Sequence, residues 1–147
     1  MTSTVAGFEI RLDLGYDPDT HLWVEEVGAS VRVGLDPLAV ESNGTLAALS
    51  FAEVGTALRR GAPFGSLEAE KFVGPLLAPR AGVLTAVNPA VLAQPSLVHA
   101  DPYAAWLAVL TPADPGDAAA LVRGAEAVRI WFAQAVHHYR LQGVLAE

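Results

Sequence analysis

Between residues 22 and 110, short runs of apolar or alternating apolar and polar residues are separated by turn residues at close spacing. This period is typical of β-strands joined by tight turns. Residues 36–40 fit one or two helical turns, and residues 1–20 form a lead-in with a turn at Asp17-Pro18-Asp19. Many short strands with frequent glycine favour a compact sandwich or barrel. The pattern predicts strands at residues 22–27, 30–34, 45–51, 64–70, 82–87 and 106–110.

The last part of the chain has a helical period. Asp114-Pro115 supplies an N-cap followed by proline at the first helical position, and Gly143 is a stop signal. We therefore expect one domain over residues 1–147, with a β core over about 16–111 and a C-terminal helix over about 115–142. The apolar stripe of this helix, at three- and four-residue spacing, consists of Leu121, Ala125, Val128, Phe132, Ala135 and Tyr139.

Composition narrows the class of protein. An apolar fraction of 52% and a charged fraction of 17% argue against disorder. No apolar run approaches the roughly 20 residues that span a bilayer, and the N-terminus lacks the pattern of a secretory signal. With no cysteine there is no disulfide framework, thiolate metal site or cysteine nucleophile. We expect a cytoplasmic protein.

The charge balance is acidic, with 16 Asp and Glu against 9 Lys and Arg and a net charge of −7. This balance disfavours nucleic acids and anionic membranes as partners, because both require basic patches. It suits a protein that docks on positively lined sites of larger partners.

Lys71 is the residue with the clearest candidate chemistry. It follows a strand-like run, Glu68 and Glu70 precede it, and a second run leads from it to a turn at Pro79 and Gly82. A lysine on a tight turn projects from the body on a rigid backbone, which a covalently attached carrier group needs. On its own, an acidic turn with a lysine is more often a solvated surface. The sequence on either side of it therefore decides between these two interpretations.

Six segments, in order from residue 16 to 110, resemble the glycine cleavage system H protein family and its relatives, the lipoyl carriers. The stretch Phe64-Gly65-Ser66-Leu67-Glu68-Ala69-Glu70-Lys71 is similar to the family motif whose lysine is lipoylated, and Pro79 and Gly82 follow at the matching spacing. The other matching segments are Tyr16 with His21-Leu22-Trp23-Val24, residues 31–35, residues 53–61, and Asn88 with residues 95–107.

The resemblance implies a mainly β, lipoyl-domain-like barrel-sandwich hybrid of two small sheets, with short helices besides the long C-terminal one. It implies a non-catalytic carrier with lipoate in amide linkage to Lys71, which shuttles a bound group between enzymes. Glu68 and Glu70 would mark the turn for a lipoate-attaching enzyme. Other implied partners are glycine decarboxylase, aminomethyltransferase and dihydrolipoyl dehydrogenase, or analogous enzymes of another lipoate-dependent pathway. Biotin is a poorer fit, because biotin carriers usually have methionines beside the lysine, and the only methionine here is Met1.

The chain also departs from the family. Leu22 stands where the family has Glu, and Leu38 where it has an aromatic residue or His, at polar positions that help line the cleft for the arm. Leucine removes hydrogen-bond partners for an ammonium-like cargo. With the long final helix, this favours a specialised relative, such as a carrier for sulfur oxidation, over glycine cleavage itself. An unmodified interaction module with the same fold is the other alternative.

The remaining polar residues suggest no catalytic or metal site. His137 and His138 are adjacent on the predicted helix, so they point in different directions and cannot both bind one metal in the i,i+4 manner. His21 shares a strand face with Trp23, and we expect a structural histidine there. No spacing of Ser, His and Asp indicates a catalytic triad.

Overall fold

The computed structural model describes residues 1–114 and 120–145. None of the helices in this part of the chain has the length and apolar character to cross a bilayer. The helices are α1 (Pro37–Asn43), α2 (Pro89–Ala93), α3 (Leu97–Ala100) and α4 (Ala125–Leu141). The strands are β1 (Thr2–Val5), β2 (Phe8–Arg11), β3 (Gly15–Tyr16), β4 (Leu22–Val27), β5 (Ser30–Leu35), β6 (Leu46–Phe51), β7 (Ala57–Leu58), β8 (Pro63–Ala69), β9 (Val73–Leu77), β10 (Gly82–Val87) and β11 (Ala108–Pro112).

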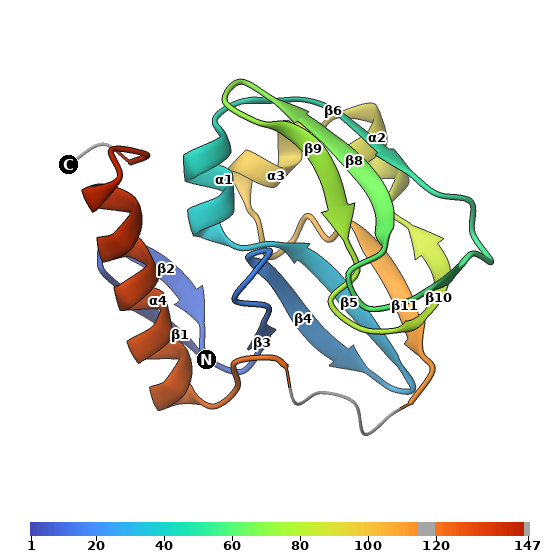
Figure 1. Ribbon diagram of the computed structural model, residues 1–147, viewed down its shortest axis with the longest axis horizontal. Helices are drawn as coiled ribbons and strands as arrows, with labels where there is room; N and C mark the ends of the chain where they lie inside the picture. The colour runs from blue at the N-terminus through green and yellow to red at the C-terminus, as the bar shows by residue number, and fades with distance from the viewer. Residues whose placement is uncertain (115–119, 146–147) are drawn as a thin grey trace.

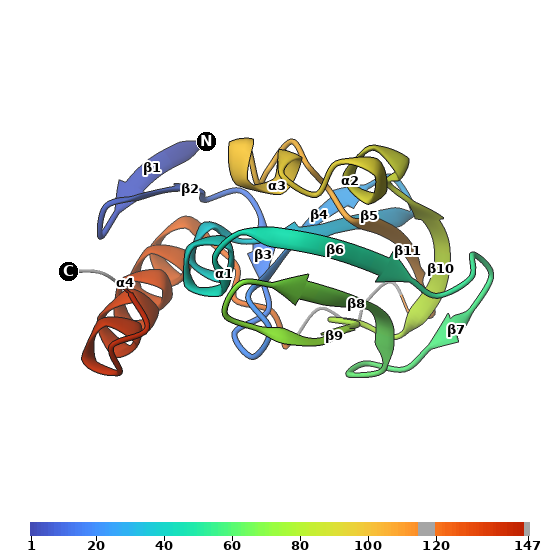
Figure 2. The same ribbon diagram turned by 90° about the horizontal axis from the view of Figure 1, so that it is seen from above.

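Two antiparallel sheets form the body of the molecule. One has six strands in the order β3-β4-β5-β11-β10-β7, and the other has three in the order β6-β8-β9. Figures 1 and 2 show them as two layers, with α2 and α3 beside β6. The sheets do not close into a barrel, so the mainly β, sandwich-like fold expected from the sequence is confirmed in an open form. A third sheet, the β1–β2 hairpin, was not predicted.

The core follows from the alternation of side chains along the strands. On β4, Leu22 and Val24 belong to the cluster that also holds Leu67 of β8 and Leu76 of β9. Trp23 between them belongs to a second cluster on the opposite face of the sheet. Both faces of this strand are buried because α4 and the hairpin cover the second face (Figure 1).

The predicted strands correspond closely to β4, β5, β6, β8 and β10. The last predicted strand, at 106–110, is shifted, because β11 begins at Ala108. The helical turns expected at 36–40 extend to Asn43 as α1, whose N-cap Asp36 accepts a hydrogen bond from the Ala39 N–H at 2.9 Å. The lead-in expected over residues 1–20 is wrong for its first half, which forms β1 and β2.

The C-terminal helix begins later than the expected residue 115. It starts at Ala125, after Gly124 with φ 91°, and residues 115–119 of the expected helix lie outside the described residues. Before the helix, Val122 forms a bridge with Tyr16, exchanging backbone hydrogen bonds of 2.8 and 3.0 Å. This pairing holds the chain extended at Val122. Leu121, the first residue of the predicted apolar stripe, therefore lies before the helix and not in it. The expected end near residue 142 agrees with Leu141.

The hairpin packs against α4 at one side of the molecule (Figure 1). The rings of Phe8 and Phe132 meet edge to face with centroids 5.7 Å apart. Arg140 Nη2 donates to the Ala6 carbonyl at 3.2 Å. The two ends of the described chain therefore build one unit around the second core cluster.

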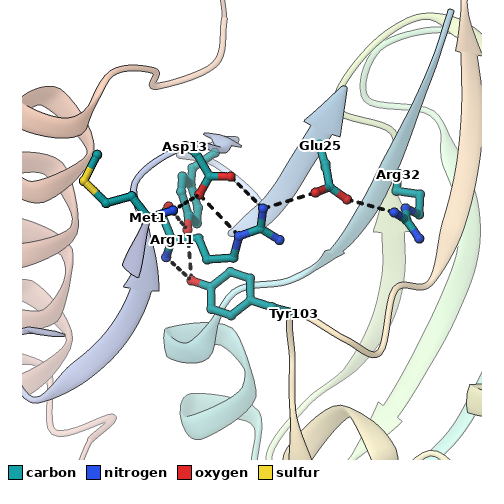
Figure 3. Close-up of polar contacts among 7 residues, drawn as sticks. Met1, Arg11, Asp13, Glu25, Arg32 and Tyr103 are labelled. Atoms are coloured by element: carbon teal, nitrogen blue, oxygen red, sulfur yellow. Dashed lines mark hydrogen bonds and ion pairs between the residues drawn. The ribbon is translucent and has the colours of Figure 1, made fainter. Parts of the chain in front are cut away.

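A polar network ties the hairpin to the six-stranded sheet (Figure 3). Arg11 pairs with Asp13 at 2.6 Å and with Glu25 at 3.2 Å, and Glu25 also pairs with Arg32 at 3.2 Å. The hydrogen bond from Arg11 lowers the pKa of Asp13 to about 2. The Tyr103 hydroxyl accepts from the Arg11 N–H at 3.3 Å.

Candidate functional site

Lys71 lies in the turn between β8 and β9, at the same end of the molecule as α1 (Figures 1 and 2). Its side chain is exposed and makes no hydrogen bond or ion pair with any residue that the structure describes. It is also the only lysine in the sequence, because all the other Lys or Arg positions are arginine. A free ε-amine on an exposed turn is accessible to a modifying enzyme.

The backbone of this turn is held by the end of α1 and the residues that follow it. The Lys71 N–H donates to the Asn43 carbonyl at 2.9 Å, and the Glu70 N–H donates to the Thr45 carbonyl at 2.9 Å. Within the turn, the Ala69 N–H donates to the Phe72 carbonyl at 2.8 Å. The lysine therefore projects from a turn in which the N–H groups of residues 69, 70 and 71 are all hydrogen-bonded, as a rigid attachment point requires.

The two carboxylates near the lysine are placed differently. Glu70 folds back, and its Oε1 accepts from the Thr45 N–H at 3.4 Å. Gly44, with φ 77°, lies so close that a Cβ there would be 2.6 Å from that oxygen. Its carbonyl accepts from His99 Nε2 at 2.7 Å. Glu68 is exposed on the three-stranded sheet, where it lies opposite Ala48 of β6 and Val73 of β9. It does not contact the residues after α1 that Glu70 contacts.

Phe72 adds an apolar surface directly after the lysine. Its side chain is 44% exposed, and its ring lies over Gly74, where a Cβ would meet the ring at 2.6 Å. A side chain at residue 74 would displace this ring.

A cleft of about 480 Å³ lies beside the turn. Its apolar walls include Leu22 and Leu35 from the six-stranded sheet and Leu67 and Leu76 from the three-stranded sheet. Leu22 therefore lines the cleft, as expected, but Leu38 does not. Leu38 is fully buried in the second core cluster, because α1 turns it toward Trp23 rather than toward the lysine. Lys71, Phe72, Pro75 and Leu77 line it on the side of the turn. Further lining residues come from α1, from the turn at residues 19–20, and from the end of α4 with the residues after it: Ala39, Ser42, Asn43, Asp19, Thr20, Tyr139, Gln142 and Val144.

His21 also lines the cleft, and it is the most constrained residue there. Its Nδ1 lies 2.8 Å from Oδ2 of Asp36, a fully buried carboxylate. Its ring stacks on Trp131 with centroids 5.2 Å apart and meets the Tyr139 ring at 5.4 Å. Its backbone has φ 59°, a left-handed conformation rare for residues other than glycine. His21 is structural, as the sequence suggested, but it precedes β4 rather than sharing a face of that strand with Trp23, and it also faces the cleft.

The electrostatic environment of His21 favours the protonated ring. Burial lowers the pKa of His21, but the charge of Asp36, the hydrogen bond to Asp36 and the charge of Asp17 outweigh burial and raise it. Near it, Thr20 Oγ1 is buried without a hydrogen-bond partner among the described residues. The cleft is thus apolar along its walls and polar at the His21 end.

Sequence reasoning missed Asp36 and Tyr139 as neighbours of the cleft. Asp36 precedes Pro37, so its role as a helix N-cap is recognisable, but its pairing with His21 depends on how β4 meets α1. Tyr139 belongs to the predicted apolar stripe, and no local signal separates a core position from a cleft wall.

These residues fit a covalently held arm. A free amine on a rigid turn supplies the attachment point, and the adjacent cleft offers apolar contact along its length with hydrogen-bonding groups at one end.

Comparison with known proteins gives consistent results. The model of the family described as Glycine cleavage H-protein matches residues 14–133. A glycine cleavage system H protein from Parasynechococcus marenigrum is 40% identical over 105 residues, covering 71% of this chain and 81% of that relative. One from Prochlorococcus marinus is 42% identical over 98 residues, covering 66% and 76%. The crystal structure of a glycine cleavage system H protein from Mycobacterium marinum matches with a TM-score of 0.69 at 34% identity, covering 81% of this chain and 96% of that one.

Proposed function

The chain belongs to the glycine cleavage H-protein family, and from this premise we propose that Lys71 is the residue to which the lipoyl group is attached. Members of this family carry lipoate covalently on a lysine, and the chain is a lipoyl carrier of glycine cleavage. The single observation that carries the assignment to Lys71 is that the sequence contains no other lysine.

The alternatives raised by the sequence are not favoured. The relatives are named glycine cleavage system H protein, which supports neither a carrier for another pathway nor an unmodified interaction module. Of the two leucines that suggested a different cargo, only Leu22 lines the cleft.

The chain's own residues position the carrier group and shelter it. Bound lipoate supplies a dithiolane that accepts a group or electrons at one active site and yields them at another. The backbone hydrogen bonds from Glu70 to Thr45 and from Lys71 to Asn43 fix the direction in which the arm leaves the body. The apolar walls around Leu67 and Leu76 reduce contact of the arm with water.

We propose that Glu68 and Glu70 contribute to recognition by the lipoate-attaching enzyme through different routes. Glu68 presents its carboxylate to the enzyme, since it is exposed on the strand that leads to the lysine. Glu70 acts indirectly, by holding the turn against Thr45.

The family implies partners of the glycine cleavage system. We propose that this chain visits glycine decarboxylase, aminomethyltransferase and dihydrolipoyl dehydrogenase, and that it performs no catalysis itself. The cytoplasmic location expected from the sequence stays a prediction.

Intact mass after coexpression with a lipoate ligase tests the attachment site. We expect one lipoyl-sized increment on the wild-type chain and none on Lys71→Arg, which keeps the charge but has no ε-amine. A matched control, Lys71→Arg with Arg60→Lys, moves the lysine to another exposed position and is expected to stay unmodified. An increment retained in Lys71→Arg, or absent from the wild type, contradicts the proposal.

A further inference from the structure

His21 occupies the cleft in a way that a purely structural histidine does not need. Nδ1 is held by Asp36 at 2.8 Å, while Nε2 has no hydrogen-bond partner among the described residues. Nε2 is not one of the fully buried polar atoms without a partner, so it retains some accessible surface, and the residue lines the cleft. The open edge of the ring is therefore Nε2, and it faces the same cleft as Lys71.

The fold maintains a strained backbone to hold this ring. Among the described residues, only Ala6 and His21 are non-glycine residues with positive φ, and Ala6 lies in the tip of the β1–β2 hairpin. At His21, the N–H donates to the Asp17 carbonyl and the carbonyl accepts from the Asp36 N–H, each at 2.9 Å. Strain of this kind persists where the surrounding structure over-determines it, and it concentrates at functional sites.

The groups around His21 favour its cationic form. The Asp36 carboxylate faces it from the start of α1, and Asp17 lies in the turn before it. From α4, the ring of Trp131 stacks on it, and the ring of Tyr139 meets its edge. Two further charged groups line the same cleft. They are Asp19, which pairs with Arg60 at 3.7 Å, and the Lys71 amine, which loses its charge in an amide.

A thiol in this cleft needs a polar partner. Apolar walls such as Leu22, Leu35 and Leu67 disfavour a thiolate by desolvation, whereas an adjacent imidazolium favours it and lowers the thiol pKa. Accordingly, we propose that His21, oriented by Asp36, donates its Nε2–H to a sulfur of the reduced lipoyl arm and stabilises the thiolate. The proton lost by the thiol goes to bulk solvent. This inference rests on the proposed attachment of lipoate to Lys71.

The test uses the lipoylated protein, confirmed by mass and reduced with a phosphine, and measures the rate of thiol alkylation by iodoacetamide against pH. His21→Asn removes the imidazolium and tolerates a positive φ. We expect the midpoint of the profile to rise by about one pH unit in this variant, a roughly tenfold loss of thiolate near neutral pH. Asp36→Asn is expected to shift the midpoint in the same direction, and His138→Gln, at an exposed histidine, is expected to leave it unchanged.

A second measurement needs no variant. Coupling between two titrating groups is reciprocal, so the NMR titration of His21 must shift when iodoacetamide blocks the reduced arm. Identical titrations before and after alkylation overturn the inference, as does an unchanged alkylation midpoint in His21→Asn. If no lipoyl group is found on Lys71, the proposed function fails and this inference fails with it. If lipoylation is confirmed but neither the alkylation midpoint nor the His21 titration shifts, this inference alone is overturned.

Discussion

At Gly34, the six-stranded sheet leaves room for the indole of Trp23. The two residues face each other across β4 and β5, and a Cβ at residue 34 would lie 2.4 Å from the ring. The ring is held from its other end by a hydrogen bond from Nε1 to the Pro102 carbonyl at 3.0 Å. Gly34 is thus required by a close approach of a side chain, not by its own backbone conformation.

Gly34→Ala should destabilise the protein by about 1–3 kcal/mol, because the added methyl overpacks a buried site that cannot expand. Urea denaturation measures the change in the free energy of unfolding. In a Trp23→Leu background the same substitution should cost less, because the ring that it would contact is gone. Equal costs in the two backgrounds would contradict the assignment of the penalty to the ring.

His21 makes stability depend on pH in a defined direction. Its pKa is raised in the folded protein, so the proton binds more tightly to the folded state than to the unfolded one. The stabilisation is fully present below the ordinary pKa near 6.5 and is lost as pH rises through the folded-state pKa. The wild type should therefore lose more stability than His21→Asn as the pH is raised above about 6.5 in urea titrations. Parallel curves for the two proteins would exclude this contribution.

Among the helices and strands, the sequence pattern predicts the ones whose ends are set by nearby residues. The strand over Leu22–Val27 alternates between two buried faces, and the turn signals on either side mark its ends. The start of α4 lacks such a signal, because the chain before it is held extended by pairing with Tyr16, a residue far away in the sequence. The β1–β2 hairpin also lacks a clear local signal, because its strands are short and weakly patterned. A two-stranded hairpin needs packing partners to be stable, and here these include α4.

The candidate site also has a part that the sequence predicts and a part that it does not. Lys71 is predictable because its turn, its flanking carboxylates and the spacing to Pro79 and Gly82 are all local in sequence. The pairing of His21 with Asp36 and the wall provided by Tyr139 are not, because they form only when β4, α1 and α4 come together. Long-range contacts of this kind have no periodic signature.

The helix α4 is held by one buried face, and Phe132 is its largest fully buried side chain. Phe132→Ala should lower the free energy of unfolding by about 3–5 kcal/mol, because it leaves a cavity against Phe8 and Trp131. Ile130→Ala on the same helix is the matched control, since Ile130 is 52% exposed, and its change should stay within about 1 kcal/mol. Similar losses for both variants would show that α4 is not anchored through this face.

The molecule as a whole consists of a carrier body and an added unit. The family match covers residues 14–133, so the β1–β2 hairpin and the last part of α4 lie outside it. These two segments pack on each other and on the second core cluster, and the residues at the end of α4 reach the cleft beside Lys71. The chain therefore combines the shared body with a cleft wall from outside the matched region.

Hydrogen exchange should separate these two parts. The hairpin is a two-stranded sheet that packs against α4 and α1, whereas β4 and β5 are paired on both sides. Amides of the hairpin, such as those of Thr4 and Ile10, should exchange through openings of lower free energy than those of Val24 and Val33. Native-state exchange monitored by NMR would detect this difference. Uniform protection across all four would indicate a single cooperative unit.

The single exposed lysine has a practical consequence. An endoprotease that cuts only after lysine finds one cleavage site in the chain, and it cannot cut there once the ε-amine is acylated. Digestion of the denatured protein therefore yields two fragments from every unmodified molecule and an intact chain from every acylated one. The ratio of bands on a gel becomes a direct measure of carrier occupancy, with no mass spectrometer and no partner enzyme.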